Sequence, residues 1–413
     1  MLPPSSRSGL ERNASLYPLY ASLFAADFWL PVFFLYFSES LSLEAAILLE
    51  SIYFAAVFLL EIPSGYFSDV IGRRITLVIA AATTALAYGL FFFATTFWQF
   101  ALAQILLAGG IAFNRGTDVS FHFDTLASLE REEEFAPREA LVARNTFAAS
   151  AIASLGGGVI GWFSLSWAYA ASLLAALGAL LIALRFTEPA AHERPASYSR
   201  DFAKQIGRSL AHLRDPALAW IFLFSIFWVV LNHIPYEFYQ PYIRLVEAKE
   251  GWSGRSTPLV AGLSSAGAML VGAFVAARST KLCQRIGTAP TMLISLVIQG
   301  AIIGVMSLML DAWVVVMLFF RVVPRALATA PINVAVAPRV EQSLRATYLS
   351  LQSLVGRLAV SGVLAGLWLL PKDHSASTWD SLSVMLRAAS VIAVVGLGLL
   401  LPTAGLARID RAE

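Results

Sequence analysis

The fold of this chain is decided by one polar stretch, Gly65-Tyr66-Phe67-Ser68-Asp69-Val70-Ile71-Gly72-Arg73-Arg74. An apolar segment long enough to cross a membrane precedes this stretch, and another follows it. Glycine permits tight backbone geometry at a turn, and arginine is concentrated in the cytoplasmic loops of membrane proteins. The stretch therefore indicates a short cytoplasmic turn between two transmembrane helices.

The composition places the whole chain in a membrane. Of its 413 residues, 58% are hydrophobic and 14% are charged, whereas a soluble domain carries about 25% charged residues. The net charge of +2 is too small to indicate a nucleic-acid partner. The single cysteine, Cys283, cannot form an internal disulfide bond. The fold therefore does not depend on an oxidising compartment.

The apolar segments predict the number of helices. A helix needs about 20 apolar residues to cross the hydrocarbon core of a bilayer, and the two-residue alternation of a transmembrane β-barrel is absent here. We therefore expect an all-α integral membrane protein with twelve spans, at approximately 17–38, 44–66, 75–95, 98–128, 139–162, 164–186, 217–245, 256–278, 289–309, 312–337, 344–370 and 382–404.

One long polar connection, at about 187–216, divides these spans into six and six. We expect an N-terminal six-helix bundle at 1–186, a cytoplasmic linker at 187–216 and a C-terminal six-helix bundle at 217–413. The basic residues orient the chain: with the amino terminus inside, the inner loops and tails carry about nineteen of them and the outer loops about three. Both termini are therefore expected in the cytoplasm.

The polar stretch resembles the GxxxDxxGRR loop signature that transporters of the major facilitator superfamily carry between their second and third helices. Gly65, Asp69, Gly72, Arg73 and Arg74 supply all five diagnostic positions at the right spacing. The resemblance extends along the whole chain in the number and layout of the spans. It implies two pseudo-symmetric six-helix bundles and places the chain in a bacterial subgroup of uncertain substrate.

The second half carries a related loop, Lys281-Leu282-Cys283-Gln284-Arg285-Ile286-Gly287, between the eighth and ninth expected spans. This loop keeps the Ile-Gly pair and the basic character of the signature, but Gln284 stands where the first half has Asp69. Two halves related by an axis along the membrane normal are typical of such transporters.

The resemblance also implies a conformational role for the signature. Asp69 would accept hydrogen bonds from the start of the eleventh helix, where free amide groups and the helix dipole favour an anion. Arg73 follows Asp69 by one turn and would bridge it to Asp124 at the inner end of the fourth helix. In similar transporters such a cluster latches the two halves on the inner side. For Arg74 we favour a role only as a positive charge that orients the chain in the membrane. The same role is the alternative to the latch for Arg73.

Charged residues inside the spans are the candidates for transport. Each costs about 2.5–3.5 kcal/mol on insertion scales, so such groups tend to face a cavity or a partner. In the fold of the family, helices one, four, seven and ten line the central cavity, which makes Asp27, Glu237 and Arg321 the best candidates. The full set is Asp27 in the first span, Arg115 and Asp118 in the fourth, His233 and Glu237 in the seventh, Arg321 and Arg325 in the tenth, and Arg357 in the eleventh.

Asp27 is the strongest single candidate for a proton carrier, because desolvation disfavours the ionised form of a carboxyl group. The alternative for Asp27 is a fixed ion pair with an arginine on another helix. His233 and Glu237, four residues apart, form an alternative proton site. For Arg115 and Asp118, which would share one face of a helix, we expect an internal salt bridge.

Two further acidic residues, Glu50 and Glu61, lie near the two ends of the second span, so we expect them at the membrane interface. The arginines of the tenth and eleventh spans give the second half an excess of positive charge. Unpaired in a cavity, they would attract an anionic substrate group, since arginine suits carboxylate and phosphate. Paired with the buried carboxylates, they would leave the cavity neutral.

The remaining motifs bear on the class of protein. No GxxxxGK[ST] nucleotide-binding loop is present, which favours a gradient over ATP as the energy source. The histidines form no HExxH or paired-His pattern, so we expect no metal, no cofactor, no catalytic residue and no enzyme activity.

We therefore expect a secondary transporter that moves a small organic molecule by alternating access. A proton is the expected coupling ion, and export of an amphipathic or anionic compound is the favoured direction. Proton-coupled uptake of a nutrient or metal chelate is one alternative, and a receptor-like homologue without transport is another. The expected partners are the substrate, the proton and the lipid bilayer, with no nucleic acid. The chain is expected to act as a monomer in the bacterial inner (plasma) membrane.

Overall fold

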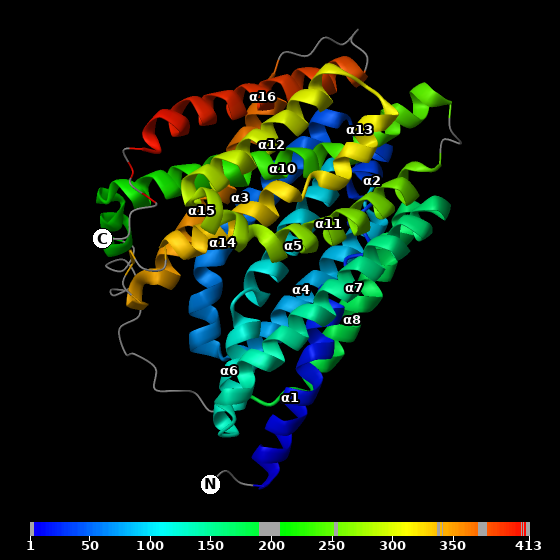
Figure 1. Cartoon of the computed structure of the whole chain (residues 1–413). Coiled ribbons are helices and arrows are strands. Elements are labelled where there is room, and N and C mark those ends of the chain that lie inside the picture. The colour runs from blue at the N-terminus through cyan, green and yellow to red at the C-terminus, as the bar shows by residue number, and fades with distance from the viewer. Residues whose placement is uncertain are drawn as a thin grey trace. The chain divides into compact units, whose positions relative to one another are not determined.

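The computed structural model describes residues 4–189, 207–251, 255–336, 339–340, 342–370 and 378–405, with 407 and 409. All regular structure in these residues is helical, as Figure 1 shows. The chain separates into two compact units: unit 1 contains Met1–Pro195 with Pro258–Leu263, and unit 2 contains Ala196–Thr257 with Ser264–Glu413. The linker expected at 187–216 lies largely outside the described residues, so its boundaries remain a prediction.

The helices of unit 1 correspond, in order, to the spans expected from the sequence. Within it, α4 lies against α5 and α8, and α3 lies against α5. Its elements are α1 (Pro4–Phe24), α2 (Phe33–Ser40), α3 (Leu43–Ile71), α4 (Arg73–Phe93), α5 (Phe97–Asn114), α6 (Thr117–Ser128), the 3-10 turn η1 (Glu132–Glu134), α7 (Phe135–Phe163) and α8 (Leu165–Leu184).

The first expected span, 17–38, is broken in its middle. α1 ends at Phe24 and α2 begins at Phe33, and the residues between them form turns, with Leu30 N donating to Asp27 O at 3.2 Å. Pro31 cannot donate a backbone hydrogen bond and disfavours a helical conformation at the residue before it. Eleven helices of the described residues are therefore long and apolar enough to cross a membrane, and the twelfth span is the divided one.

Two further spans are interrupted. The fourth expected span is divided into α5 and α6 at Arg115 and Gly116, and Gly116 has a φ of 79°, which favours glycine. The tenth runs from α13 through the 3-10 turn η3, and turns at Arg321 before α14 begins at Val323. In contrast α10 is a single helix that continues through Pro235 and Pro241, so these prolines do not end it.

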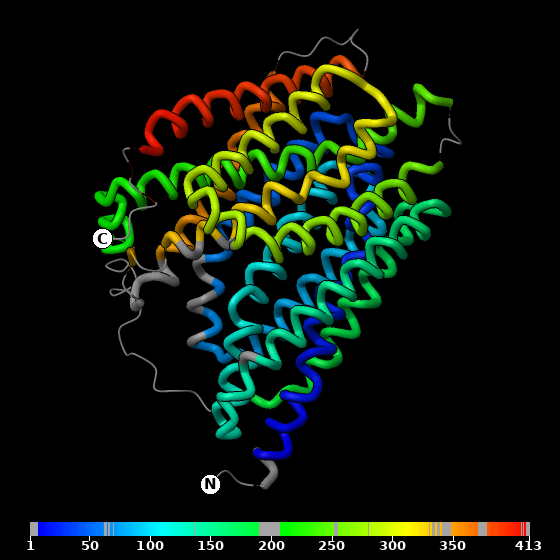
Figure 2. The backbone as a smooth tube through the Cα atoms, in the orientation of Figure 1, coloured from blue at the N-terminus to red at the C-terminus, as the bar shows by residue number. Residues whose placement is uncertain are grey.

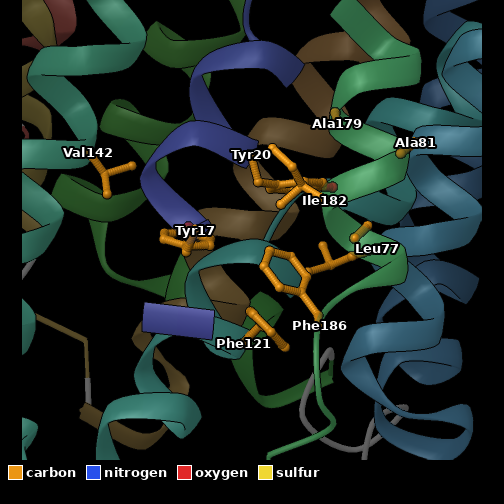
Figure 3. Close-up of a cluster of buried hydrophobic side chains, with 10 residues drawn as sticks. Tyr17, Tyr20, Leu77, Ala81, Phe121, Val142, Ala179, Ile182 and Phe186 are labelled. Atoms are coloured by element: carbon orange, nitrogen blue, oxygen red, sulfur yellow. The ribbon is translucent and has the colours of Figure 1, made fainter. Parts of the chain in front are cut away.

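One end of unit 1 is held by a cluster of buried hydrophobic side chains, shown in Figure 3, of which Tyr17, Tyr20, Phe121 and Phe186 are aromatic. Phe121 of α6 lies 4.6 Å from Phe186 between ring centroids, and Tyr20 of α1 lies 5.5 Å from Phe186 in an edge-on arrangement. Such pairs contribute about 0.5–1.5 kcal/mol each beyond the area they bury. The cluster fixes α1 against α6 and the end of α8.

Unit 2 repeats the same succession of helices, which can be followed along the tube in Figure 2. Within it, α12 lies side by side with α16, and α10 packs against α15. Its elements are η2 (His212–Arg214), α10 (Pro216–Glu250), α11 (Thr257–Ile286), α12 (Thr288–Leu308), α13 (Ala312–Met317), η3 (Leu318–Phe320), α14 (Val323–Val336), α15 (Gln342–Trp368) and α16 (Thr378–Thr403).

The two basic loops noted in the sequence have the same local geometry. Gly72 joins α3 to α4 with φ 108° and ψ 152°, and Gly287 joins α11 to α12 with φ 95° and ψ 163°. Thr76 donates its hydroxyl to the Gly72 carbonyl at 2.8 Å, and Thr291 does the same to Gly287 at 2.7 Å. Each unit therefore contains the same glycine-dependent turn at the same place.

Candidate functional site

The break in the first span places Asp27 beside two hydrogen-bond donors. The Tyr88 hydroxyl donates to Asp27 Oδ1 at 2.6 Å, and Trp29 Nε1 donates to the same oxygen at 3.1 Å. Trp29 Nε1 also donates to the Tyr88 hydroxyl at 2.9 Å. Tyr88 comes from α4, so the site joins the broken span to its neighbour. Its geometry depends on the break, because a continuous helix would use the backbone groups of residues 25–32 internally.

The surroundings of Asp27 are neutral. Ser172 of α8 accepts a hydrogen bond from the backbone N–H of Trp29 at 3.2 Å, and the ring of Tyr169 stacks on Trp29. Among the described residues, no basic side chain lies within 4.0 Å of the Asp27 carboxylate. The fixed ion pair with an arginine, which the sequence left open, is therefore absent from the described part of the chain.

In unit 2, the positively charged Arg321 lies at the interruption of the tenth span. Arg321 is 8% exposed, and its Nη1 donates to Ser264 Oγ at 2.8 Å and to the carbonyl of Leu318 at 2.9 Å. Its Nη2 donates to Ser265 Oγ at 3.0 Å, and its guanidinium carbon lies 4.4 Å from the ring centroid of Tyr239. Hydroxyls, a carbonyl and an aromatic face stabilise this cation, and none of these groups carries a full negative charge.

The other candidates of unit 2 lie in different surroundings. Glu237 is fully buried in α10, and His233 donates from Nδ1 to the carbonyl of Val229 at 2.7 Å. Arg325 is exposed, and Arg357 is partly buried on α15. Of the three arginines expected to give the second half its positive charge, Arg321 is thus the one that the structure buries.

The signature loop holds α4 in place through Arg73. Its Nε lies 2.5 Å from Oδ2 of Asp124, which is buried at the inner end of α6. Arg74 donates from Nη2 to the carbonyl of Leu184 at 3.1 Å. Gly65 and Asp69 both lie in α3, but the structure does not describe the surroundings of Gly65 or the side chain of Asp69. The part of the latch that involves Asp69 therefore stays a prediction.

Glu188, which the sequence gave no reason to single out, completes this loop. Its carboxylate accepts from the backbone N–H of Arg73 at 2.7 Å and of Arg74 at 2.9 Å, where the start of α4 favours an anion. A Cβ atom at Gly72 would lie 3.0 Å from that carboxylate. Gly72 is thus required both for its positive φ and for the approach of Glu188.

The expected salt bridge between Arg115 and Asp118 is wrong, because the helix is broken between them. Arg115 lies 4.0 Å from Glu61 instead. Asp118 accepts hydrogen bonds from Asn114 Nδ2 at 3.2 Å and from the backbone of Val119 at 2.8 Å. The three- and four-residue spacing of a continuous helix does not apply across a glycine turn.

The burial of Glu50 was not expected from the sequence, whereas its depth relative to the membrane interface remains a prediction. Glu50 is 6% exposed inside unit 1, and Gln104 of α5 donates to its Oε1 at 2.8 Å from a position that is also buried. The sequence placed Glu50 only by its distance from the end of a span. Gln104, a polar residue within the fourth apolar segment, is the sequence signal that could have indicated a buried polar partner.

Comparisons with known proteins agree with this architecture. The family model described as Major Facilitator Superfamily matches residues 16–366. The nucleoside transporter NupG has a similar structure, with a TM-score of 0.75 and 12% identity over 94% of this chain and 98% of that chain. No curated protein matches the chain in sequence.

Two further solved structures share the fold. A bacterial homologue of the human lysosomal transporter Spinster matches with a TM-score of 0.68 and 16% identity, covering all of both chains. The peptide transporter POT in complex with sulfate matches with a TM-score of 0.71 and 12% identity over 98% of this chain and 96% of that chain. At such identities the likeness shows the fold alone. Since the family model covers most of the sequence, the chain belongs to the Major Facilitator Superfamily, as an all-α, multi-pass membrane transporter.

Proposed function

We propose that this chain is a proton-coupled secondary transporter that moves a small organic molecule by alternating access. Export is the direction we favour, and uptake of a nutrient or metal chelate is the alternative. The proposal places the chain as a monomer in a bacterial inner membrane, with both termini in the cytoplasm. The excess of basic residues in the inner loops supports that orientation.

The observation that carries the proposal is the setting of Asp27. At the break of the first span, the hydrogen-bond donors to this carboxyl group in the described part of the chain are all neutral. Discontinuous helices commonly form the substrate and ion sites of secondary transporters, because their unwound backbone and side chains face a cavity. An ionised carboxylate without a cation is costly in such a place. Proton binding and release at Asp27 would therefore change the charge of the site during transport.

The surroundings of Arg321 favour a substrate that carries an anionic group. Its cation is buried among neutral groups, and its planar fork suits a carboxylate or phosphate. Two donors of the guanidinium, Nε–H and one hydrogen of Nη2, are not used by the described hydrogen bonds of Arg321. We therefore favour a small organic anion or an amphipathic molecule with an anionic end.

The first test identifies the class of substrate. Purified protein is heated with three sets of small compounds, namely organic anions, organic cations and neutral amphipathic molecules. A ligand stabilises the state that it binds, by RT ln(1 + [L]/Kd). We expect stabilisation by organic anions, its loss in Arg321→Gln, and its retention in Arg325→Gln, a matched control at an exposed arginine of the same span. Stabilisation by cations alone would reject the anionic class.

The second test concerns coupling. Protein reconstituted in vesicles with an internal pH-sensitive dye receives the best stabilising compound on one side. The proposal expects proton movement that depends on the compound and that Asp27→Asn abolishes. Movement of the compound without protons would support a uniporter. Binding without any movement of the compound would support the receptor-like alternative.

A further inference from the structure

A second acidic residue, Glu50, lies deep in unit 1 and has no part in the function proposed above. It is on α3, seven residues after the helix begins at Leu43, or roughly 10 Å along the helix axis. Its side chain is 6% exposed. The amide of Gln104 on α5 donates to its Oε1 at 2.8 Å. Glu50 is therefore a buried carboxyl group on a helix long and apolar enough to cross a membrane, and a neutral amide donates to it.

The charge state of this carboxyl group follows from its surroundings. In the described part of the chain, no Lys, Arg or His side chain lies within 4.0 Å of Glu50. Removing a carboxylate from water costs more than one hydrogen bond from a neutral amide returns. A proton on the carboxyl group removes that cost. The site therefore favours the protonated form of the Glu50 carboxyl group.

A buried tyrosine packs against the Asp27 site. Tyr169 of α8 is fully buried, and its hydroxyl makes no hydrogen bond within the described residues. Its ring stacks on Trp29, which donates to Asp27. A buried hydroxyl without a hydrogen-bond partner among the described residues therefore lies on a ring that packs against the Asp27 site.

The internal repeat of the fold places a polar residue at the position of Glu50 in both units. The offset that takes Gly72 to Gly287 also takes Thr96, which caps α5, to Asp311, which caps α13. The same offset takes Glu50 to Ser265. In unit 2, Ser265 and its neighbour Ser264 bind the side chain that the tenth span presents, which is Arg321. In unit 1, Glu50 binds the side chain that the fourth span presents, which is Gln104.

We propose that Glu50 and Gln104 form a second proton-binding site of unit 1, distinct from Asp27. In the closed site the carboxyl group keeps its proton and accepts the amide N–H of Gln104. When water reaches the site, the carboxyl group gives the proton to water and remains as a carboxylate held by the same amide. Its use in transport rests on the proposed function, whereas its protonation does not.

The test measures protonation directly in the purified full-length chain. Infrared difference spectra between acidic and alkaline solution report each carboxyl group that gains or loses a proton. We expect Glu50→Gln to remove one band of a protonated carboxyl group and Asp27→Asn to remove another. Glu44→Gln, at a partly exposed carboxyl group in the first turn of the same helix, is the matched control and should leave both bands.

A second variant protects the test against a folding defect in Glu50→Gln. In Gln104→Leu the Glu50 band should persist but move, because the carbonyl loses its amide donor. An identical set of bands in the wild type and Glu50→Gln would overturn the proposal, and so would an unmoved band in Gln104→Leu. If the wild-type protein moves its substrate without protons in the vesicle assay and still shows the Glu50 band, the proposed function is rejected and this site remains in place.

Discussion

Two substitutions of Asp27 separate its structural role from its role in coupling. Asp27 Oδ1 accepts both the Tyr88 hydroxyl and Trp29 Nε1. Asparagine retains that oxygen, so Asp27→Asn should keep both hydrogen bonds and change the free energy of unfolding by less than about 1 kcal/mol. Leucine removes the acceptor and leaves the buried Tyr88 hydroxyl without it, which should cost about 1–3 kcal/mol.

Both variants should lose substrate-dependent proton movement, because neither carries a group that can titrate at this position. The free energy of unfolding is measured in mixed micelles, and proton movement is measured in vesicles with an internal pH-sensitive dye. The reasoning is refuted if Asp27→Asn still moves protons with substrate. A leucine variant as stable as the wild type would show that the hydrogen bonds to Oδ1 contribute nothing.

Three further substitutions test the surrounding structure. Gly72→Ala should lower the free energy of unfolding by about 1–3 kcal/mol, because its backbone conformation is suited to glycine and its Cβ would meet Glu188, while Gly89→Ala, with open space around it, is the control. Arg321→Lys should weaken the binding of organic anions about tenfold in a thermal-shift titration, since a lysine cannot reproduce the planar fork, and unchanged binding would exclude this arginine from the site. Ser265→Asp should abolish anion binding in the same titration, because a carboxylate beside the guanidinium would occupy it.

The number of spans was predictable, but the continuity of three of them was not. Hydropathy measures the length of an apolar segment and carries no information on its backbone hydrogen bonds. The breaks have local signals that are common in unbroken transmembrane helices too, namely Pro31, Gly116 and Pro324. The prolines of α10 show the difficulty, because this helix continues through both of them.

The candidate site was predictable only in its charged members. Asp27 and Arg321 stood out because a charge in an apolar span requires a compensating environment. Their partners, Tyr88 and Ser264, are neutral residues from other helices, and a single sequence does not show which helices are neighbours. The burial of Glu50 was missed for the same reason: it comes from the packing of α3 against α5, which span boundaries do not report.

The two units share the same turn but bury different polar pairs, Glu50 with Gln104 in unit 1 and Ser265 with Arg321 in unit 2. This difference explains how two similar units can carry different side-chain chemistry. Gly72 and Gly287 adopt a backbone conformation suited to glycine, so the turn between the second and third helices of each unit tolerates little change. Within a span the choice of residue is less restricted, because different polar side chains can be buried there if a neighbouring helix supplies their hydrogen-bond partners. Unit 1 uses that freedom for a carboxyl group at Glu50, whereas unit 2 places Ser265 there to hold a guanidinium group. The repeat therefore provides one position for a polar side chain in each unit, and the residue at that position decides whether it is a carboxyl group that accepts from an amide or a hydroxyl that accepts from a guanidinium group.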